Sequence, residues 1–264
     1  MPDPLPFHAG NLPTRRLLGL DFAALTPDAV LHHLLARPAA APFGYVVTPN
    51  ADHLVRLARD PALRPVYAGA EVCLLDSRLV RRSARTLGLP APPAVPGSDL
   101  TARLLAALGD RERVTIIGLP PAFVPALVAR TGIAPPAHHD PPQGFEHDKG
   151  AFAAAVRFVL DHPARFVLLA VGAPRQERLA AAIAATGQAR GLGLCVGASL
   201  DFLSGRARRA PVWMQRAGLE WLHRLGSEPR RLAGRYLRED PAIFALLLRE
   251  RLPPPEKGRA GCQR

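Results

Sequence analysis

Five short apolar runs, each followed by a turn and then by a helical pattern, constrain the fold more than any other feature of the sequence. The runs are residues 43–47, 71–75, 114–117, 166–171 and 192–196. Runs of this length are typical of buried strands, and their alternation with helical patterns is typical of a parallel sheet with helices on both faces. We therefore predict an α/β fold with a mostly parallel, Rossmann-like sheet and flanking helices.

The chain divides by composition into a core and less regular ends. Its 264 residues are 48% hydrophobic, which is enough to bury a sizeable core. We predict four regions, namely a flexible arm over 1–13, the α/β core over 14–205, a basic helical appendage over 206–252 and a disordered tail over 253–264. Within the core we expect two lobes, about 14–100 and 101–205. The sequence has no signal-peptide pattern and no uncharged apolar run of about 18 residues, so we expect a cytoplasmic protein without a spanning helix.

Polar residues follow two of the predicted strands. Asp76 comes directly after the run 71–75, and Thr48 and Asn50 follow the run 43–47. In parallel sheets, ligands bind at the carboxyl ends of the strands, where a carboxylate such as Asp76 can act as a general base on a hydroxyl. Each residue also has a purely structural interpretation, because Asp at this place can cap a helix or stand in a turn, and Thr-Pro-Asn is ordinary turn chemistry.

A Gly-Ala-Pro-Arg-Gln-Glu segment begins at Gly172, between a predicted strand and a predicted helix. Glycine permits close backbone approach, helix-start amides bind phosphate, and Arg175 and Gln176 can add donors. A plain strand-to-helix turn with solvated charges explains the segment equally well. The turn after the next strand holds Gly197, and Asp201 beyond it is either a ligand contact or a helix cap.

Positive charge concentrates near the C-terminus. The net charge is +12, and residues 206–252 hold eleven Arg against five acidic residues. Apolar residues are interleaved among them at helical spacing. Basic amphipathic helices lie on anionic membranes, where each Arg contributes about 1 kcal/mol. A nucleic-acid backbone or a solvated helical lobe are the alternatives, and the apolar face favours the membrane over nucleic acid. An exposed apolar face can equally drive self-association into a homo-oligomer.

The sequence shows no pattern typical of a metal or cofactor site. Its three cysteines form no CxxC pair, and it contains neither an Asp-x-Asp pair nor a dinucleotide or P-loop glycine motif. We therefore expect no bound metal and no cofactor.

Several segments, in their order and spacing, resemble the WecG/TagA/CpsF family of glycosyltransferases (glycosyltransferase family 26) over residues 17–238. The segments that carry the resemblance are 48–50, 76, 97–100, 172–177, 197–202, 209–215, 218–221, 224–225 and 228–231. The resemblance implies an inverting transfer of a hexosyl or N-acetylhexosaminyl group from a UDP-sugar to a polyprenyl-diphosphate-linked saccharide. It also implies a place in the synthesis of bacterial surface polysaccharides such as exopolysaccharides.

The resemblance further implies roles for particular residues. Asp76 maps to the family's general base, and Thr48, Asn50 and Gln176 map to its pocket residues. The C-terminal appendage is implied to dock on the inner face of the plasma membrane and to close the active site. The residues expected to meet the membrane or the acceptor diphosphate are Arg209, Trp213, Arg216, Trp221, Arg224, Arg230 and Arg231. A nucleic-acid partner is not expected.

The chain departs from the family pattern at two positions. Members often have Gly after the catalytic Asp, where this chain has Ser77. Many also have Arg three residues before the Gly-Ser-Asp segment, where this chain has Ala94. If that Arg helps to hold the diphosphate, another Arg must substitute, and Arg78, Arg81 and Arg82 are near in sequence. The alternatives left open are an inactive family member that serves as a scaffold and a nucleic-acid-binding α/β protein.

Overall fold

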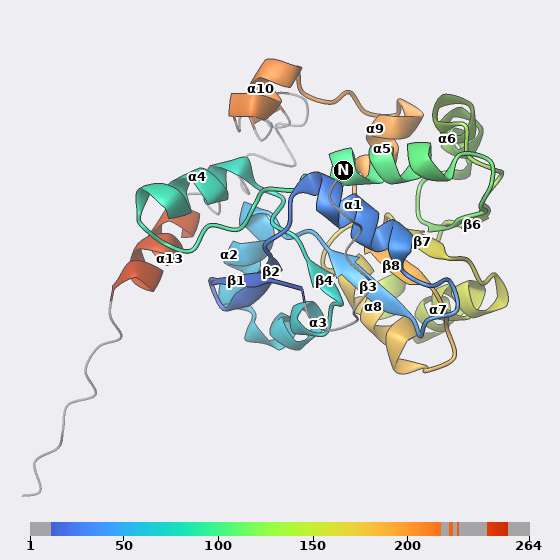
Figure 1. The fold of residues 1–264 in the computed structure, drawn as a ribbon. Helices are drawn as coiled ribbons and strands as arrows, with labels where there is room; N and C mark the ends of the chain where they lie inside the picture. Colours follow the sequence, from blue (N-terminus) through green and yellow to red (C-terminus); the bar gives the residue numbers. More distant parts are fainter. Residues whose placement is uncertain (1–11, 218–221, 224–225, 227–241, 253–264) are drawn as a thin grey trace, which may run out of the picture.

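The computed structural model describes residues 12–217, 222–223, 226 and 242–252, which form an α/β fold (Figure 1). Six strands make one sheet in the order β4-β3-β8-β7-β5-β6, and all neighbouring pairs are parallel. The strands are β3 (Gly44–Val47), β4 (Val72–Cys73), β5 (Thr115–Ile117), β6 (Ala137–His139), β7 (Phe166–Leu169) and β8 (Leu192–Cys195). A separate antiparallel hairpin consists of β1 (Thr14–Leu17) and β2 (Leu20–Ala23). The predicted parallel sheet is confirmed, whereas the division of the core into two lobes stays a prediction.

Helices cover both faces of the sheet. Side chains along each strand alternate between two apolar clusters, so that Tyr45 and Val47 belong to one and Val46 to the other. The helices that bury residues in the cluster of Val46 are α1 (Pro27–Ala36), α5 (Gly97–Leu108), α6 (Val124–Thr131) and α9 (Ser199–Ser204). Those that bury residues in the cluster of Val47 are α2 (Ala51–Arg59), α3 (Arg64–Ala68), α4 (Arg78–Thr86), α7 (Lys149–Asp161) and α8 (Arg175–Ala185).

Side-chain caps explain where four helices begin. Thr26 Oγ1 accepts a hydrogen bond from Ala29 N at 3.3 Å at the start of α1. Asn50, Ser77 and Asp148 cap α2, α4 and α7 in the same way. Each cap satisfies a backbone donor that has no partner inside its helix.

Two helices of the predicted C-terminal appendage lie in the described part of the chain, α10 (Val212–Ala217) and α13 (Ala242–Arg251). Helix α13 packs against α2 and α4 and buries Ile243 and Leu247. No helix in the described ranges is both long enough and apolar enough to cross a membrane. The parts that lie outside the described residues are the arm before residue 12, the tail 253–264, the side chain of Arg216, and Trp221, Arg224, Arg230 and Arg231.

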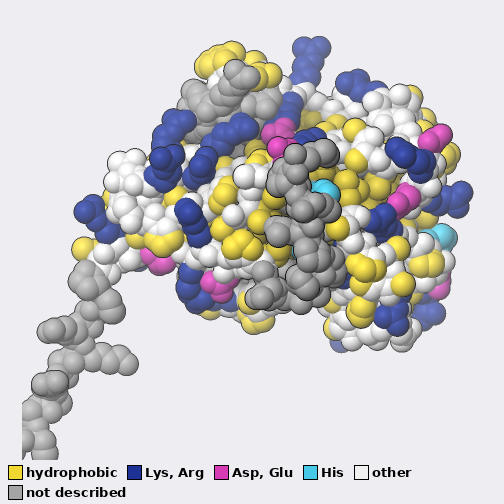
Figure 2. Space-filling view, viewed as in Figure 1, with side chains coloured by type: hydrophobic (Ala, Val, Ile, Leu, Met, Phe, Trp, Pro, Cys, Tyr) yellow, Lys and Arg dark blue, Asp and Glu magenta, His cyan; other side chains and the backbone are white. Residues whose placement is uncertain are grey.

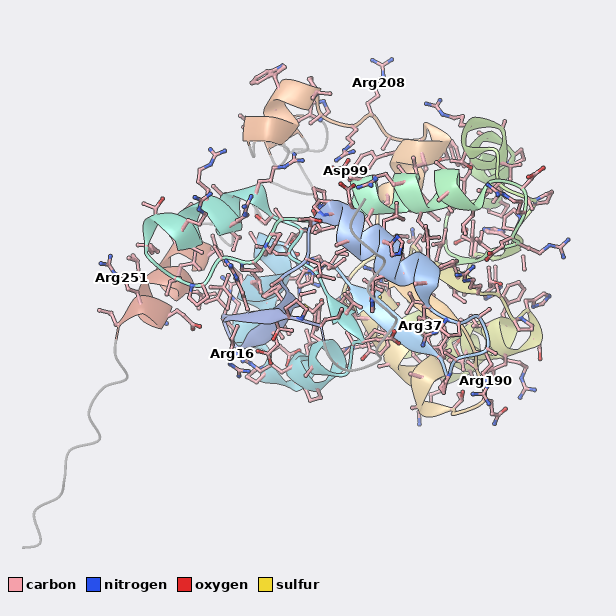
Figure 3. The ribbon with its side chains drawn as sticks, viewed as in Figure 1. Arg16, Arg37, Asp99, Arg190, Arg208 and Arg251 are labelled. Carbon is pink, nitrogen blue, oxygen red and sulfur yellow. The ribbon has the colours of Figure 1, made fainter. Side chains whose placement is uncertain are left out.

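A buried arginine ties together the amino ends of three neighbouring strands (Figure 3). Arg37 is 5% exposed, and its Nε and Nη2 donate to the two carboxylate oxygens of Glu71 at 2.7 and 2.8 Å. Its Nη1 donates to Gly191 O at 2.9 Å and its Nη2 also donates to Pro42 O at 2.5 Å. These partners precede β4, β8 and β3, so one guanidinium fixes the starts of all three strands.

We expect Arg37→Met to lower the free energy of unfolding by about 2 kcal/mol or more, because it leaves a partly buried carboxylate and two carbonyls without their donor. Arg16→Met is the matched control, since Arg16 pairs with Asp21 at 3.1 Å on the surface with 66% of its side chain exposed. That change should cost less than about 1 kcal/mol. Urea unfolding of both variants tests this, and equal effects would contradict the role given to Arg37.

Candidate active site

The predicted site residues come from the loops that follow four neighbouring strands, β4, β3, β8 and β7. Because these strands are parallel, their carboxyl ends lie along one side of the sheet, here called the carboxyl edge. Asp76 follows β4, and Thr48 and Asn50 follow β3. Gly172 follows β7 and Gly197 follows β8. The sheet therefore brings together residues from the two halves of the core.

Asp76 and Thr48 both lie against the first residue of α5. A Cβ atom placed on Gly97 would be 2.9 Å from Thr48 Oγ1 and 3.4 Å from Asp76 Oδ2. The two loops are also joined by backbone, because Asp76 N donates to Pro49 O at 3.0 Å. The carboxylate and the hydroxyl are half-buried, and both lie beside the start of α5. A side chain at position 97 would crowd both oxygens.

The structural alternatives for the strand-end residues have different outcomes. The interpretation of Asp76 as a helix cap is wrong, because Ser77 caps α4 and its Oγ accepts from Val80 N at 3.1 Å. Asn50 does cap α2, where its Oδ1 accepts from His53 N at 3.3 Å. The turn interpretation of Asn50 is therefore confirmed, and its contact with a ligand stays a prediction.

The loops after β7 and β8 are held together by one side chain. Gln176 Oε1 accepts a hydrogen bond from Gly197 N at 3.0 Å. Gly172 has a φ of +80°, which glycine adopts without strain, and a Cβ there would lie 3.2 Å from Arg175 Nη2. Arg175 Nε in turn lies 3.8 Å from Glu146 Oε1. The guanidinium is thus placed over the glycine turn at the carboxyl edge.

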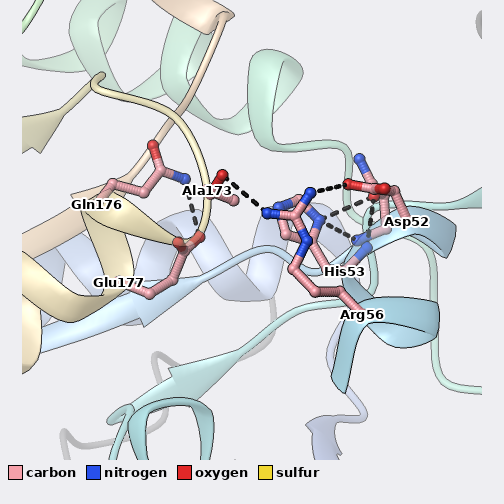
Figure 4. Close-up of polar contacts among 7 residues, drawn as sticks. Asp52, His53, Arg56, Ala173, Gln176 and Glu177 are labelled. Carbon is pink, nitrogen blue, oxygen red and sulfur yellow. Dashed lines mark hydrogen bonds and ion pairs between the residues drawn. The ribbon is translucent and has the colours of Figure 1, made fainter. Parts of the chain in front are cut away.

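Gln176 and Glu177 form a buried pair behind this loop (Figure 4). Gln176 Nε2 donates to Glu177 Oε1 at 2.9 Å, so both ends of the amide are engaged inside the protein. Burial raises the pKa of Glu177 from 4.5 to about 7. Glu177 Oε2 is buried and has no hydrogen-bond partner within the described residues.

Arg56 connects α2 to the loop after β7, a role that sequence reasoning missed (Figure 4). Its Nη1 donates to Ala173 O at 3.1 Å, and its Nη2 donates to Asp52 Oδ2 at 3.2 Å. Asp52 is only 3% exposed. The four-residue spacing of Asp52 and Arg56 on a helix was a readable signal for the ion pair. Nothing local indicates the contact with Ala173, which is 117 residues away from Arg56.

Helices that begin at the carboxyl edge differ in whether a side chain caps their first backbone N–H groups. Helices α2 and α4 have side-chain caps, whereas α5, α8 and α9 have none. Their N-cap residues are Pro96, Pro174 and Ala198, which carry no side-chain acceptor. Uncapped amides and the positive ends of helix dipoles favour a bound anion. The starts of the longer helices α5 and α8 thus suit this edge to a phosphate-bearing ligand.

Acidic side chains at this edge pair with arginines that follow α9 or belong to α4. Arg209 Nη1 donates to Asp99 Oδ1 at 2.5 Å, in the first turn of α5, and Arg78 Nη2 lies 3.7 Å from Asp99 Oδ2 (Figure 3). Asp201 Oδ1 accepts from Arg206 Nη1 at 2.9 Å. Asp201 lies inside α9, where Ala198 is the N-cap, so its interpretation as a cap is wrong. Its contact with a ligand stays a prediction.

The sequence profile of the glycosyl transferase WecG/TagA/CpsF family matches residues 15–257. The chain belongs to this family. Membership in the WecG/TagA/CpsF family makes the protein a glycosyltransferase with a sugar donor and an acceptor as substrates, and it associates the protein with surface-polysaccharide synthesis. The match includes both the carboxyl edge and the C-terminal helices, so the predicted family is confirmed over the folded chain.

The described residues contain no group of three or more His, Cys, Asp or Glu side chains arranged to hold a metal ion. Cys73 and Cys195 are buried and free, and burial raises the pKa of both thiols. The expectation that this glycosyltransferase works without metal or cofactor stays a prediction.

The raised pKa of Glu177 predicts a pH-dependent stability. Between about pH 4.5 and 7 the folded protein keeps a proton that the unfolded chain releases, so stability should fall as pH rises through this window. The shift corresponds to about 3 kcal/mol. Glu177→Gln should remove this loss, because Gln fits the same space without a charge. Urea unfolding at pH 5 and pH 8 measures it, and parallel pH profiles for the two proteins would contradict the prediction.

Proposed function

We propose that this glycosyltransferase moves a hexosyl or N-acetylhexosaminyl group from a UDP-sugar to a polyprenyl-diphosphate-linked saccharide, with inversion at the anomeric carbon. The observation that carries the proposal is the convergence of the Asp76 carboxylate and the Thr48 hydroxyl beside the uncapped start of α5. A carboxylate base beside a helix start that favours anions supports a reaction in which a hydroxyl attacks and a diphosphate leaves.

In the proposed reaction Asp76 accepts the proton of the acceptor hydroxyl while the hydroxyl oxygen attacks the anomeric carbon. The bond from that carbon to the diphosphate oxygen breaks, and UDP departs with the electron pair. Attack from the face opposite the leaving group inverts the configuration. Negative charge that grows on the diphosphate is stabilised by the amides at the start of α8 and by Arg175.

The surrounding residues position this machinery. Gln176 fixes the turn at Gly197 by accepting a hydrogen bond from its backbone N–H. Arg56 fixes the turn at Ala173 by donating a hydrogen bond to its carbonyl oxygen. We assign Asn50 and Asp201 to the wall of the same pocket, with Asn50 fixed in place by its cap on α2. Because these contacts are formed within the protein, the pocket is preorganised before substrates bind.

Asp76→Asn should lower turnover by about 10² to 10⁴-fold, because the amide cannot accept the proton. The measurement is UDP release with a short-chain lipid-diphosphate-linked acceptor, screened across UDP-sugars. Asp60→Asn is the matched control, because Asp60 caps the short 3-10 helix Pro61–Leu63 beyond the far end of α2 and Asn is an equally good cap. Near-normal turnover by a folded Asp76→Asn protein would exclude Asp76 as the base.

The second part of the proposal is attachment to the inner face of the plasma membrane without a spanning helix. Within the described residues, every large apolar side chain that is exposed lies in the C-terminal region. These side chains are Val212, Trp213, Leu222, Phe244, Leu248 and Leu252. Together with the arginines of the same region they support a basic surface with apolar side chains that enter the headgroup layer.

Val212→Ser/Trp213→Ser should weaken binding to anionic vesicles by about tenfold or more, because two exposed apolar side chains of α10, at 59% and 64%, lose their contact with lipid. These point changes leave Ile243 and Leu247 in the core, which deletion of the whole appendage would not. Sedimentation with anionic and with neutral vesicles measures the effect. Unchanged binding to the anionic vesicles would remove α10 from the docking surface.

A further inference from the structure

Helix α4 carries four arginines on one face. They are Arg78, Arg81, Arg82 and Arg85. Their spacing places them along a single side of the helix. The other side packs into the core through Val80 and Ala84, which are fully buried. The helix is therefore amphipathic, with a polar side made mostly of guanidinium groups.

These arginines line a groove of about 570 Å³ together with Thr86 and Ala94. Its volume is in the range of small-molecule sites in proteins. Figure 2 shows basic side chains gathered over α4. The small side chain of Ala94 forms part of the wall, so this position leaves the groove open.

The concentration of positive charge on α4 destabilises the folded protein. Arginines three and four residues apart repel one another, and Arg78 and Arg81 also oppose the positive end of the helix dipole. Arg78 has Asp99 near it at 3.7 Å. Arg81, Arg82 and Arg85 form no ion pair with any residue that the structure describes. A bound polyanion would turn this repulsion into attraction.

The groove adjoins the proposed base. Ala94 forms a parallel bridge with Leu75, and Val95 N donates to Leu75 O at 2.9 Å. Asp76 is the next residue in the chain. Arg78 reaches from the groove toward Asp99 at the start of α5, the same helix start that lies beside Asp76 and Thr48. A ligand in the groove thus lies beside the reacting centre rather than on a remote surface.

We infer that this α4 groove binds the diphosphate group of a substrate through the guanidinium groups of Arg81, Arg82 and Arg85. Arginine presents several donors in a plane that matches phosphate oxygens, and adjacent guanidinium groups match the charge of a diphosphate. The inference rests on the proposed function for the identity of the ligand. Two substrates carry such a group, the lipid-linked acceptor and the UDP-sugar, and binding measurements distinguish them.

The test is calorimetric titration of the full chain with three probes: inorganic diphosphate, farnesyl diphosphate and UDP. Arg81→Gln/Arg82→Gln/Arg85→Gln should weaken binding of inorganic diphosphate by about tenfold or more, because charge-assisted hydrogen bonds are lost. The matched control, Arg111→Gln/Arg113→Gln/Arg157→Gln, removes the same charge from exposed sites elsewhere. It should change affinity less than about twofold, because distant surface charges are screened.

The probes identify the source of the diphosphate. Weakened farnesyl diphosphate binding with unchanged UDP binding assigns the groove to the acceptor, and the reverse assigns it to the donor. The inference is overturned if both triple Gln variants weaken the binding of inorganic diphosphate equally, or if neither weakens it. Arg81→Lys/Arg82→Lys/Arg85→Lys keeps the charge without the guanidinium groups and should bind with intermediate affinity. Asp76→Asn should keep diphosphate binding, so failure of the catalytic proposal is seen separately.

Discussion

The parallel pairing of β3 with β4 on one side and with β8 on the other is the constraint on which the site depends. Val47 is paired with Cys73, and Val46 with both Val72 and Leu194. Because the strands run in the same direction and end at similar heights, their loops start side by side. The hydrogen bond from Asp76 N to Pro49 O extends that pairing beyond the strands. A register shift of one residue would turn the strand faces over and separate the two loops.

The amino ends and the carboxyl ends of the strands differ in how their polar groups are satisfied. At the amino ends Arg37 satisfies a partly buried carboxylate and two carbonyls, so these ends are closed by an ion pair and hydrogen bonds. At the carboxyl edge α5 and α8 begin without side-chain caps, and arginines lie near both helix starts. Stability and ligand binding are thus assigned to different ends of the same strands, and a substitution at one end need not disturb the other.

Features set by local pattern were predictable from the sequence, and features set by packing were not. The strands and the turns that carry Thr48, Asp76 and Gly172 follow from apolar runs bounded by turn residues. Local pattern offered Asp76 as a helix cap, and only the fold assigns the cap of α4 to Ser77. The burial of Glu177 likewise depends on elements far away in sequence, since a helical carboxylate otherwise points to solvent.

The α4 groove has an alanine, Ala94, at a position where many family members have an arginine. An arginine at position 94 would place a single cation on the wall beside Leu75, and its side chain would fill part of the groove. With Ala94 the wall is short, and the positive charge comes from a helix face across the groove. In the proposed site several guanidinium groups on one helix contact a polyanion at several oxygens, whereas a single long side chain contacts fewer of them. The buried side chains of Val80 and Ala84 fix the position of α4 against the core. The position of the bound substrate therefore depends on how these two side chains pack.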